Sequence, residues 1–125
     1  MGSITANVDH DRKLLLVRAM GPITFEDIRA HLEEERLAGG LPYRELIDAR
    51  GYRPAFSAKD VQAIVALLHR LGRDSRLGPT AIIVDSDDGY GMIRMLEMLV
   101  EDACAIRPFR RQEEAEKWLA GFPSE

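Results

Sequence analysis

Apolar and polar residues recur along the chain in two patterns. Short apolar runs bounded by glycine, proline or charged residues are typical of strands, and apolar residues spaced three and four apart are typical of amphipathic helices. These patterns predict strands over residues 3–8, 13–20, 46–48, 80–84 and 106–109. They predict helices over residues 24–39, 57–72, 89–103 and 112–120.

The predicted elements follow the order ββαβαβαβα, which indicates an α/β domain. Strands that alternate with helices form parallel sheets through right-handed crossovers. We therefore expect a single domain over residues 1–125, with a mostly parallel five-stranded sheet and helices packed mainly on one face. A short polar turn joins the first two strands, which should form an antiparallel hairpin. Pro108 interrupts the last strand and places it at an edge.

Two helix starts carry the same capping signal. Thr24 with Asp27, and Ser57 with Asp60, have the spacing at which two side chains cap each other's backbone N–H groups. The glutamates at 33–35 are expected on the outer, solvated side of the first helix. The residues predicted to be nearly fully buried are Val65, Leu68, Ile82, Val84, Leu96 and Trp118.

Composition and charge narrow the class of protein. The net charge is −4 and the isoelectric point is about 5.4, which argues against nucleic acid as a partner. Cys104 is the one cysteine, so an intrachain disulfide is excluded and a reducing, cytoplasmic location is expected. The sequence has no secretory signal and no apolar run of membrane-spanning length, so integral membrane association is not expected.

Polar side chains follow two strands that should be neighbours in the sheet. Ligand sites in parallel α/β sheets form at the carboxyl ends of strands, where the loops after these two strands should converge. Their polar and aromatic residues are Asp48, Arg50, Tyr52, Arg53 and Ser57 in one loop, and Asp85, Ser86, Asp87, Tyr90 and Arg94 in the other. These residues predict a surface that binds a small polar ligand or a protein partner. The free N–H groups at the two helix N-termini would favour an anionic group there.

Each of these residues also has a purely structural interpretation. Ser57 can simply cap its helix, residues 85–88 have the composition of a turn, and Arg94 can pair with nearby carboxylates. The three histidines share no ligand spacing, so we expect solvated or packing histidines and no metal site. We predict no catalytic residues and no cofactor, because the sequence has neither the pattern of a catalytic triad nor a glycine-rich phosphate loop.

Three segments carry a resemblance to a known family. They read LIDARGYRPAFSAKDV, DGYGMIRMLEML and FRRQEEAEKWL. With the order of the elements, they make the chain resemble the STAS and SpoIIAA-like domains of anti-sigma-factor antagonists, in their uncharacterised bacterial branch, and the fold is similar to that of CRAL-TRIO lipid-binding domains. The resemblance implies a phosphorylatable serine at a helix N-terminus, after a strand that ends in Asp. Asp48 and Ser57 take those places here, with Phe56 where the family has an acidic residue.

Three functions are carried forward. The first is a non-enzymatic regulatory or protein-interaction module that contacts another regulatory protein and is switched at Ser57. The second is a domain that binds a small molecule or lipid, and the third is an enzyme that uses the cleft at the strand ends. A shallow polar patch there would favour the first, and an apolar cavity between sheet and helices the second. Two converging carboxylates with strongly shifted pKa values would favour the third.

The second strand also predicts an assembly. Leu14 and Leu16 point to one face of this strand, and Leu15 and Val17 point to the other. Helices on one side of the sheet leave the opposite apolar face to be covered, either by the final helix or by a second copy of the chain. We expect a symmetric homodimer, because two-fold pairing buries the same patch on both copies.

Overall fold

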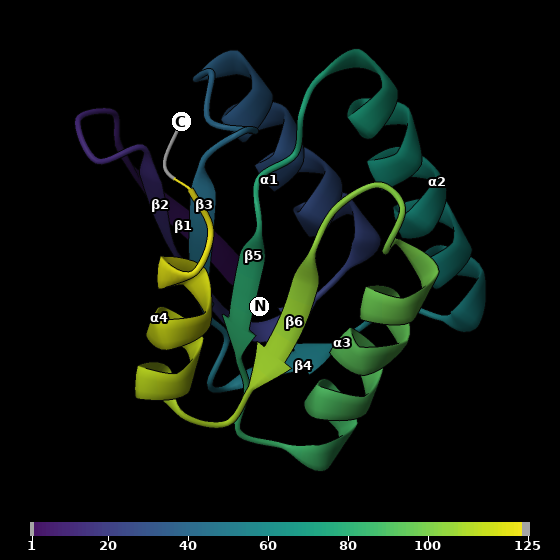
Figure 1. The fold of residues 1–125 in the computed structure, drawn as a ribbon. Helices are drawn as coiled ribbons and strands as arrows, with labels where there is room; N and C mark the ends of the chain where they lie inside the picture. Colours follow the sequence, from purple (N-terminus) through teal and green to yellow (C-terminus); the bar gives the residue numbers. More distant parts are fainter. Residues whose placement is uncertain (1, 124–125) are drawn as a thin grey trace.

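The computed structural model describes residues 2–123 (Figure 1). Its strands are β1 (Ser3–Asp9), β2 (Leu14–Ile23), β3 (Arg44–Asp48), β4 (Tyr52–Pro54), β5 (Thr80–Ile83) and β6 (Ile106–Phe109). Its helices are α1 (Phe25–Leu37), α2 (Ala58–Asp74), α3 (Asp87–Leu99) and α4 (Gln112–Ala120). The alternation of strands and helices confirms the predicted α/β class.

The six strands formed by residues 2–123 belong to one sheet. Their order is β1-β2-β3-β5-β6, and β4 pairs with the end of β2. β1 and β2 are antiparallel, whereas all other neighbours are parallel. The predicted hairpin and the mostly parallel sheet are therefore confirmed, and β6 is an edge strand, as Pro108 indicated.

β4 falls in a segment predicted as a loop, and β2 extends past Met20, where the sequence predicted its end. β2 continues to Ile23 and pairs there with β4. Backbone hydrogen bonds run from Gly21 N to Gly51 O at 3.0 Å and from Ala55 N to Ile23 O at 2.8 Å. The residues on either side of Pro22 make these bonds, so the missing N–H of Pro22 removes none of them.

Helices cover both faces of the sheet (Figure 1). α1, α2 and α3 lie on one face, and the main cluster of buried apolar side chains lies between them and the sheet. α4 packs on the opposite face against β3, β5 and β6, where Ala115 and Leu119 cluster with Ala81 and Ile83. The prediction that the helices pack mainly on one face of the sheet is thus confirmed, and the final helix covers part of the other face.

Part of the outer face of β2 remains exposed. Leu16 and Met20 are 41% and 44% exposed, whereas Leu15 and Val17 of the same strand are buried. The homodimer expected from the sequence stays a prediction, and these two exposed side chains lie on the face that it would use.

Capping boxes begin α1 and α2, as predicted. In α2, the Asp60 N–H donates to Oγ of Ser57 at 3.2 Å, and the Ser57 N–H donates to Oδ2 of Asp60 at 3.0 Å. Thr24 and Asp27 form the same two bonds at the start of α1, at 2.9 and 3.2 Å. Each pair satisfies two backbone N–H groups that a helix start otherwise leaves without partners.

Three helices end at positions other than those predicted, and α1 ends two residues early, at Leu37. α2 continues through Gly72 to Asp74, because a glycine inside a helix costs only about 1 kcal/mol relative to alanine. α3 ends at Leu99, and residues 100–103 form a turn. No helix within residues 2–123 is long and apolar enough to span a membrane. The cytoplasmic location expected from the sequence stays a prediction.

Most of the predicted core residues are buried. Leu68, Ile82, Val84 and Leu96 are 7, 9, 1 and 5% exposed, respectively. The prediction of near-complete burial is wrong for Val65 and Trp118, which are partly exposed. Val65 lies at the flank of the buried face of α2. Trp118 lies at the edge of α4, with its ring 5.7 Å from that of Phe109 and 4.8 Å from that of Phe122.

Leu68→Ala should lower the free energy of unfolding by about 2–5 kcal/mol, because Leu68 is buried and its truncation leaves a void in the core. Leu37→Ala is the matched control, since Leu37 of α1 is 73% exposed and its truncation leaves no void. Urea denaturation measures both values. A loss below about 1 kcal/mol for Leu68→Ala would mean that this side of α2 does not face the core.

Candidate functional site

The two loops that follow β3 and β5 meet, as the strand order predicts. β3 and β5 are neighbours, and the Gly51 N–H donates to Oδ1 of Asp85 at 3.1 Å. Asp48 accepts two hydrogen bonds from the guanidinium of Arg50, at 2.9 and 2.8 Å, which hold the pKa of Asp48 below its usual value. Arg53 is exposed. The carboxylates of Asp48 and Asp85 are thus engaged within the loops themselves.

Three further residues of the predicted surface have structural roles. Tyr52 is buried, its hydroxyl donates to the Gly89 carbonyl at 3.3 Å, and burial raises its pKa to about 12. Oγ of Ser86 accepts from the Gly89 N–H at 3.0 Å and caps α3. Ser57 caps α2 and is exposed. Tyr52 is therefore a core residue, whereas Ser57 is accessible.

The remaining residues of the predicted surface form ion pairs or a cation–π contact. Arg110 donates to Oδ1 of Asp87 at 2.7 Å, and its guanidinium lies 4.7 Å from the centre of the Tyr90 ring. Arg94 lies further along α3, where it donates to Glu97 at 2.7 Å and lines a groove beside β6. The use of the strand-end surface by a ligand or partner stays a prediction.

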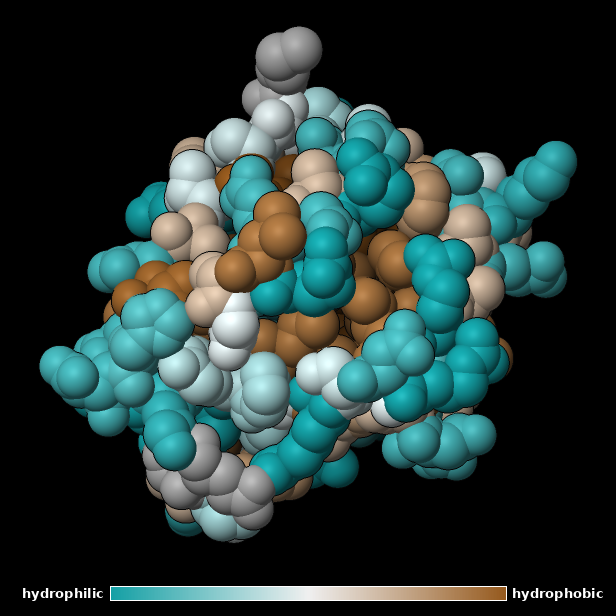
Figure 2. Space-filling view, turned by 90° about the horizontal axis from the view of Figure 1, so that it is seen from above, coloured by the Kyte–Doolittle hydropathy of each residue, from teal (hydrophilic) through white to brown (hydrophobic). Residues whose placement is uncertain are grey.

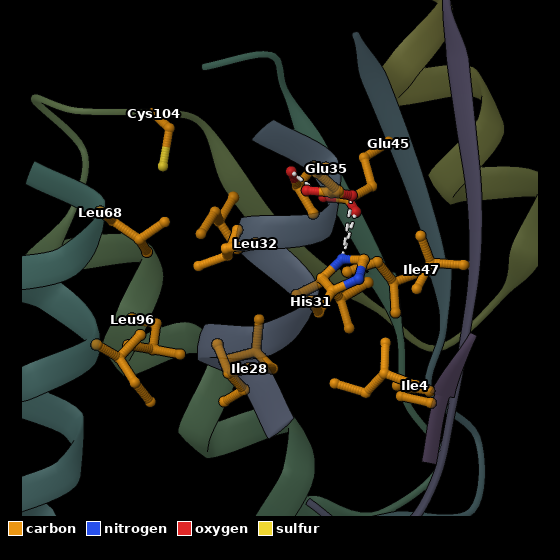
Figure 3. Close-up of a pocket in the computed structure, with 18 of the residues that line it drawn as sticks. Ile4, Ile28, His31, Leu32, Glu35, Glu45, Ile47, Leu68, Leu96 and Cys104 are labelled. Carbon is orange, nitrogen blue, oxygen red and sulfur yellow. Dashed lines mark hydrogen bonds and ion pairs between the residues drawn. The ribbon is translucent and has the colours of Figure 1, made fainter. Parts of the chain in front are cut away.

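A cavity of about 150 Å³ lies between the sheet and helices α1, α2 and α3 (Figure 3). It extends from Leu41 and Gly78, in the loops that lead into β3 and β5, to Tyr52 and Phe56. Figure 2 looks onto the end at which the parallel strands begin and shows apolar side chains in a hollow there. Ligand sites in parallel α/β sheets usually form at the carboxyl ends of the strands, whereas this hollow lies at the opposite end of the sheet.

The cavity is mostly apolar and has one polar wall. The apolar side chains include Ile4, Ile28, Leu32, Ile47, Leu68 and Leu96 (Figure 3). The polar wall consists of His31 and Glu35 from α1, Glu45 from β3 and Thr80 from β5, and we call these four residues the polar cluster.

Within the polar cluster, His31 lies between two carboxyl groups. Its Nε2 is 3.0 Å from Oε2 of Glu35 and 3.0 Å from Oε2 of Glu45, and a hydrogen bond joins it to Glu45. Oε2 of Glu35 accepts no hydrogen bond from residues 2–123. Thr80 donates to the other oxygen of Glu45 at 3.1 Å. His31, Glu35 and Glu45 are only 8, 3 and 6% exposed, so the cluster is shielded from water.

The periodicities of α1 and β3 bring the cluster together. Ile28, His31, Leu32 and Glu35 lie three or four residues apart and share the face of α1 that lines the cavity. Glu45 lies on the side of β3 that faces the same cavity. The placement of Glu35 on the solvated side of α1 is therefore wrong, and His31 is an ion-paired residue rather than a solvated or simply packed one. The sequence does carry a signal for their burial, because His31 and Glu35 fall on the same helical stripe as the apolar residues Ile28 and Leu32.

The fold is similar to that of a solved structure, although neither a protein-family model nor a curated protein matches the sequence. The solved structure is that of an uncharacterised protein of the DUF3478 family from Shewanella loihica PV-4, which has a SpoIIAA-like fold. It aligns with a TM-score of 0.64 and 18% sequence identity over 95% of each chain. This chain has a SpoIIAA-like fold. The fold that the three sequence segments implied is thus confirmed.

In this SpoIIAA-like domain, the polar cluster shifts the protonation of its members. Burial lowers the pKa of His31, but the adjoining carboxyl groups outweigh this effect and raise it to about 10. Burial and the charge of Glu45 raise the pKa of Glu35 to about 9. Burial raises the pKa of Glu45, but its contacts with Glu35, His31 and Thr80 outweigh burial and lower it. At neutral pH the cluster therefore holds a His31 cation, a Glu45 carboxylate and a protonated Glu35, with no net charge.

The SpoIIAA-like cavity thus combines apolar walls with a few converging polar groups, as ligand sites do. Two converging carboxyl groups with shifted pKa values were also the sign expected of an enzyme. Cys104 lines the same cavity, but burial raises the pKa of its thiol to about 11, so it is not an activated nucleophile. The apolar walls and the polar cluster can together hold a small molecule that has both kinds of surface.

The free energy of unfolding should fall as the pH rises from about 5 to about 10. The ordinary pKa values of 6.5 for His31 and 4.5 for Glu35 become about 10 and about 9 in the fold. A raised pKa contributes stability that is fully present below the ordinary value and is lost as the pH rises through the folded value. Both groups act in the same direction, because the folded protein binds more protons than the unfolded chain across this range.

Chemical denaturation across this pH range measures the dependence. Glu35→Gln keeps the shape of the protonated acid but cannot titrate. It should therefore remove the contribution of Glu35 to the pH dependence of stability, between its ordinary pKa of 4.5 and its pKa of about 9 in the fold. Glu34→Gln is the control, because Glu34 is exposed on the same helix. A stability that stays constant or rises with pH in the wild type would contradict the assigned protonation.

Proposed function

We propose that this protein binds a small, mostly apolar molecule in the cavity between its sheet and helices. The observation that carries the proposal is the polar wall of an otherwise apolar cavity, where buried Oε2 of Glu35 accepts no hydrogen bond from the described chain, residues 2–123. A buried oxygen that accepts no hydrogen bond costs up to about 1–3 kcal/mol, of which the contact with His31 at 3.0 Å offsets a part. A ligand that donates a hydrogen bond to this oxygen would recover the rest. The fold by itself does not define a function.

The volume of the cavity sets the size of the ligand. An engineered cavity of about 150 Å³ with aliphatic and aromatic walls binds benzene. The cavity of this protein has a similar volume of about 150 Å³. A long lipid chain needs more space, so the small molecule is favoured over the lipid that the CRAL-TRIO similarity suggests.

The polar wall sets the functional group of the ligand. A carboxylate would lose its hydration in this cavity without a free positive charge to pair with, because the His31 cation is already paired with Glu45. A hydroxyl or amino group can instead donate to Oε2 of Glu35 while the ring fills the apolar part, with Leu32, Leu68 and Leu96. The ligand that fits is therefore a single ring that carries one hydroxyl or amino group.

Phenol and aniline should bind in the cavity more tightly than benzene, and benzoate should not bind, because only the first two present a neutral donor to Glu35. Methyl resonances of Leu32, Leu68 and Leu96 in NMR titrations report occupancy. Leu32→Phe should fill the cavity and abolish binding, whereas Leu37→Phe, an exposed position on the same helix, should not. The absence of methyl shifts with all four compounds at millimolar concentration would overturn the proposal.

We retain a second function, a regulatory interaction module switched at Ser57, because of where Ser57 lies. Ser57 is exposed at the N-terminus of α2, where a phosphate would be stabilised by free N–H groups and the helix dipole. Asp48 ends β3, and Arg50 lies in the turn between β3 and β4, both upstream of Ser57 in the chain. A phosphate at Ser57 would change the charge of this surface and recruit or release another regulatory protein.

Ser57→Ala should lower the free energy of unfolding by about 1 kcal/mol and should also abolish phosphate incorporation by a cellular kinase. Thr24→Ala is the matched control, because Thr24 makes the same capping bonds in α1 and should lose similar stability while phosphate incorporation is retained. Mass spectrometry locates the phosphate. Phosphate at other positions with Ser57 always unmodified would remove the switch and leave only the cap.

A further inference from the structure

We propose that His31, Glu35 and Glu45 bind one divalent transition-metal ion at the polar wall of the cavity. Nε2 of His31 and one carboxyl oxygen from each glutamate all lie within 4.8 Å of one another. All three side chains are buried and point to one place (Figure 3). The inference rests on this geometry and does not depend on the organic ligand proposed above.

The distances are close to those of a three-ligand metal site. A tetrahedral ion with bonds of about 2.0–2.2 Å holds its ligand atoms about 3.3–3.6 Å apart. Nε2 of His31 is 3.0 Å from each of the two Oε2 atoms, and the three ligand atoms lie within 4.8 Å of one another, so side-chain adjustments would bring them to an ion. His31 and Glu35 are four residues apart on α1, the spacing at which helical zinc motifs place two ligands on one face.

Charge and hydrogen bonding favour a cation at this position. When an ion binds, Glu35 and His31 each release a proton, and the two carboxylates then carry the charge that one divalent ion neutralises. Without an ion, the His31 ring lies between the two carboxyl groups. Oε2 of Glu35 contacts His31 at 3.0 Å but accepts no hydrogen bond from residues 2–123, so an ion would exchange one ionic contact of this oxygen for another.

Thr80 provides the outer contact that metal-binding carboxylates usually have. Its hydroxyl donates to Oε1 of Glu45 at 3.1 Å, which orients the carboxylate and leaves Oε2 directed at His31. Such outer contacts orient metal ligands, and their loss typically weakens metal binding by about 10- to 100-fold.

The donor set indicates the class of ion. One imidazole nitrogen and two carboxylate oxygens suit Zn²⁺, Mn²⁺ or Fe²⁺, whereas Ca²⁺ and Mg²⁺ require about six or more oxygen ligands. Three protein ligands leave a coordination position open, as in catalytic rather than structural zinc sites. The cavity lies beside the cluster, so this position faces a space that a water molecule or a small donor molecule can fill.

The test uses the metal alone. Chelator-dialysed protein is titrated with ZnCl₂ by calorimetry and with CoCl₂ by visible absorption, which reports tetrahedral coordination. We expect one ion per chain with micromolar or tighter affinity. His31→Gln and Glu35→Gln should each weaken binding by more than about tenfold and remove the cobalt absorption bands. Glu34→Gln, an exposed glutamate on the same helix, should leave both unchanged.

Thr80→Val is a second variant that keeps all three ligands and nearly the same side-chain shape. It should weaken Zn²⁺ binding by about 10- to 100-fold, and circular dichroism verifies that each variant is folded. The proposal is overturned if the wild type binds no Zn²⁺ up to about 1 mM, or if Glu35→Gln binds as the wild type does. Neither result involves phenol or aniline, so a failure of the metal site is distinguishable from a failure of the proposed ligand.

Discussion

The buried contact of His31 with Glu35 and Glu45 is the interaction on which the rest of the structure depends. It joins α1 to β3 beneath the surface and beside the cavity. Each of these groups would be costly to bury alone, because an unpaired charge loses several kcal/mol of hydration. They are tolerated only as a set, so removing one member has a larger effect than removing an exposed ion pair such as that of Arg94 with Glu97.

Periodicity is sufficient to predict most of this fold. The apolar stripe of α2 and the β-branched run of β5 are strong local signals, and both elements form where those signals lie. β4 has no such signal, because its three residues become a strand only through pairing with the end of β2. The face occupied by α4 is also not predictable from crossover handedness, because no strand follows α4 within the described chain to make it part of a crossover.

The candidate site is less predictable, because its parts are separated in the chain. The residues at the carboxyl ends of the strands are charged and conspicuous, but Asp48 and Asp87 pair with nearby arginines. The polar cluster joins a helix to a strand, and a glutamate within an acidic run such as 33–35 is ordinarily solvated. Only the position of Glu35 on the stripe of Ile28 indicates that it faces inward, and the partner Glu45 is identified only by the pairing of β3 in the sheet.

The inward position of Glu45 also selects the pairing register of β3. Side chains alternate along a strand, so Glu45 faces the cavity and His31, while Leu46 packs with Ala81 and Leu119 beneath α4. A slip of one residue would exchange the two faces and press a carboxylate into that second apolar cluster. Such a misaligned sheet would bury a charge away from His31, at a cost of several kcal/mol. The polar cluster thereby discriminates between correct and shifted alignments of the strand while the sheet assembles.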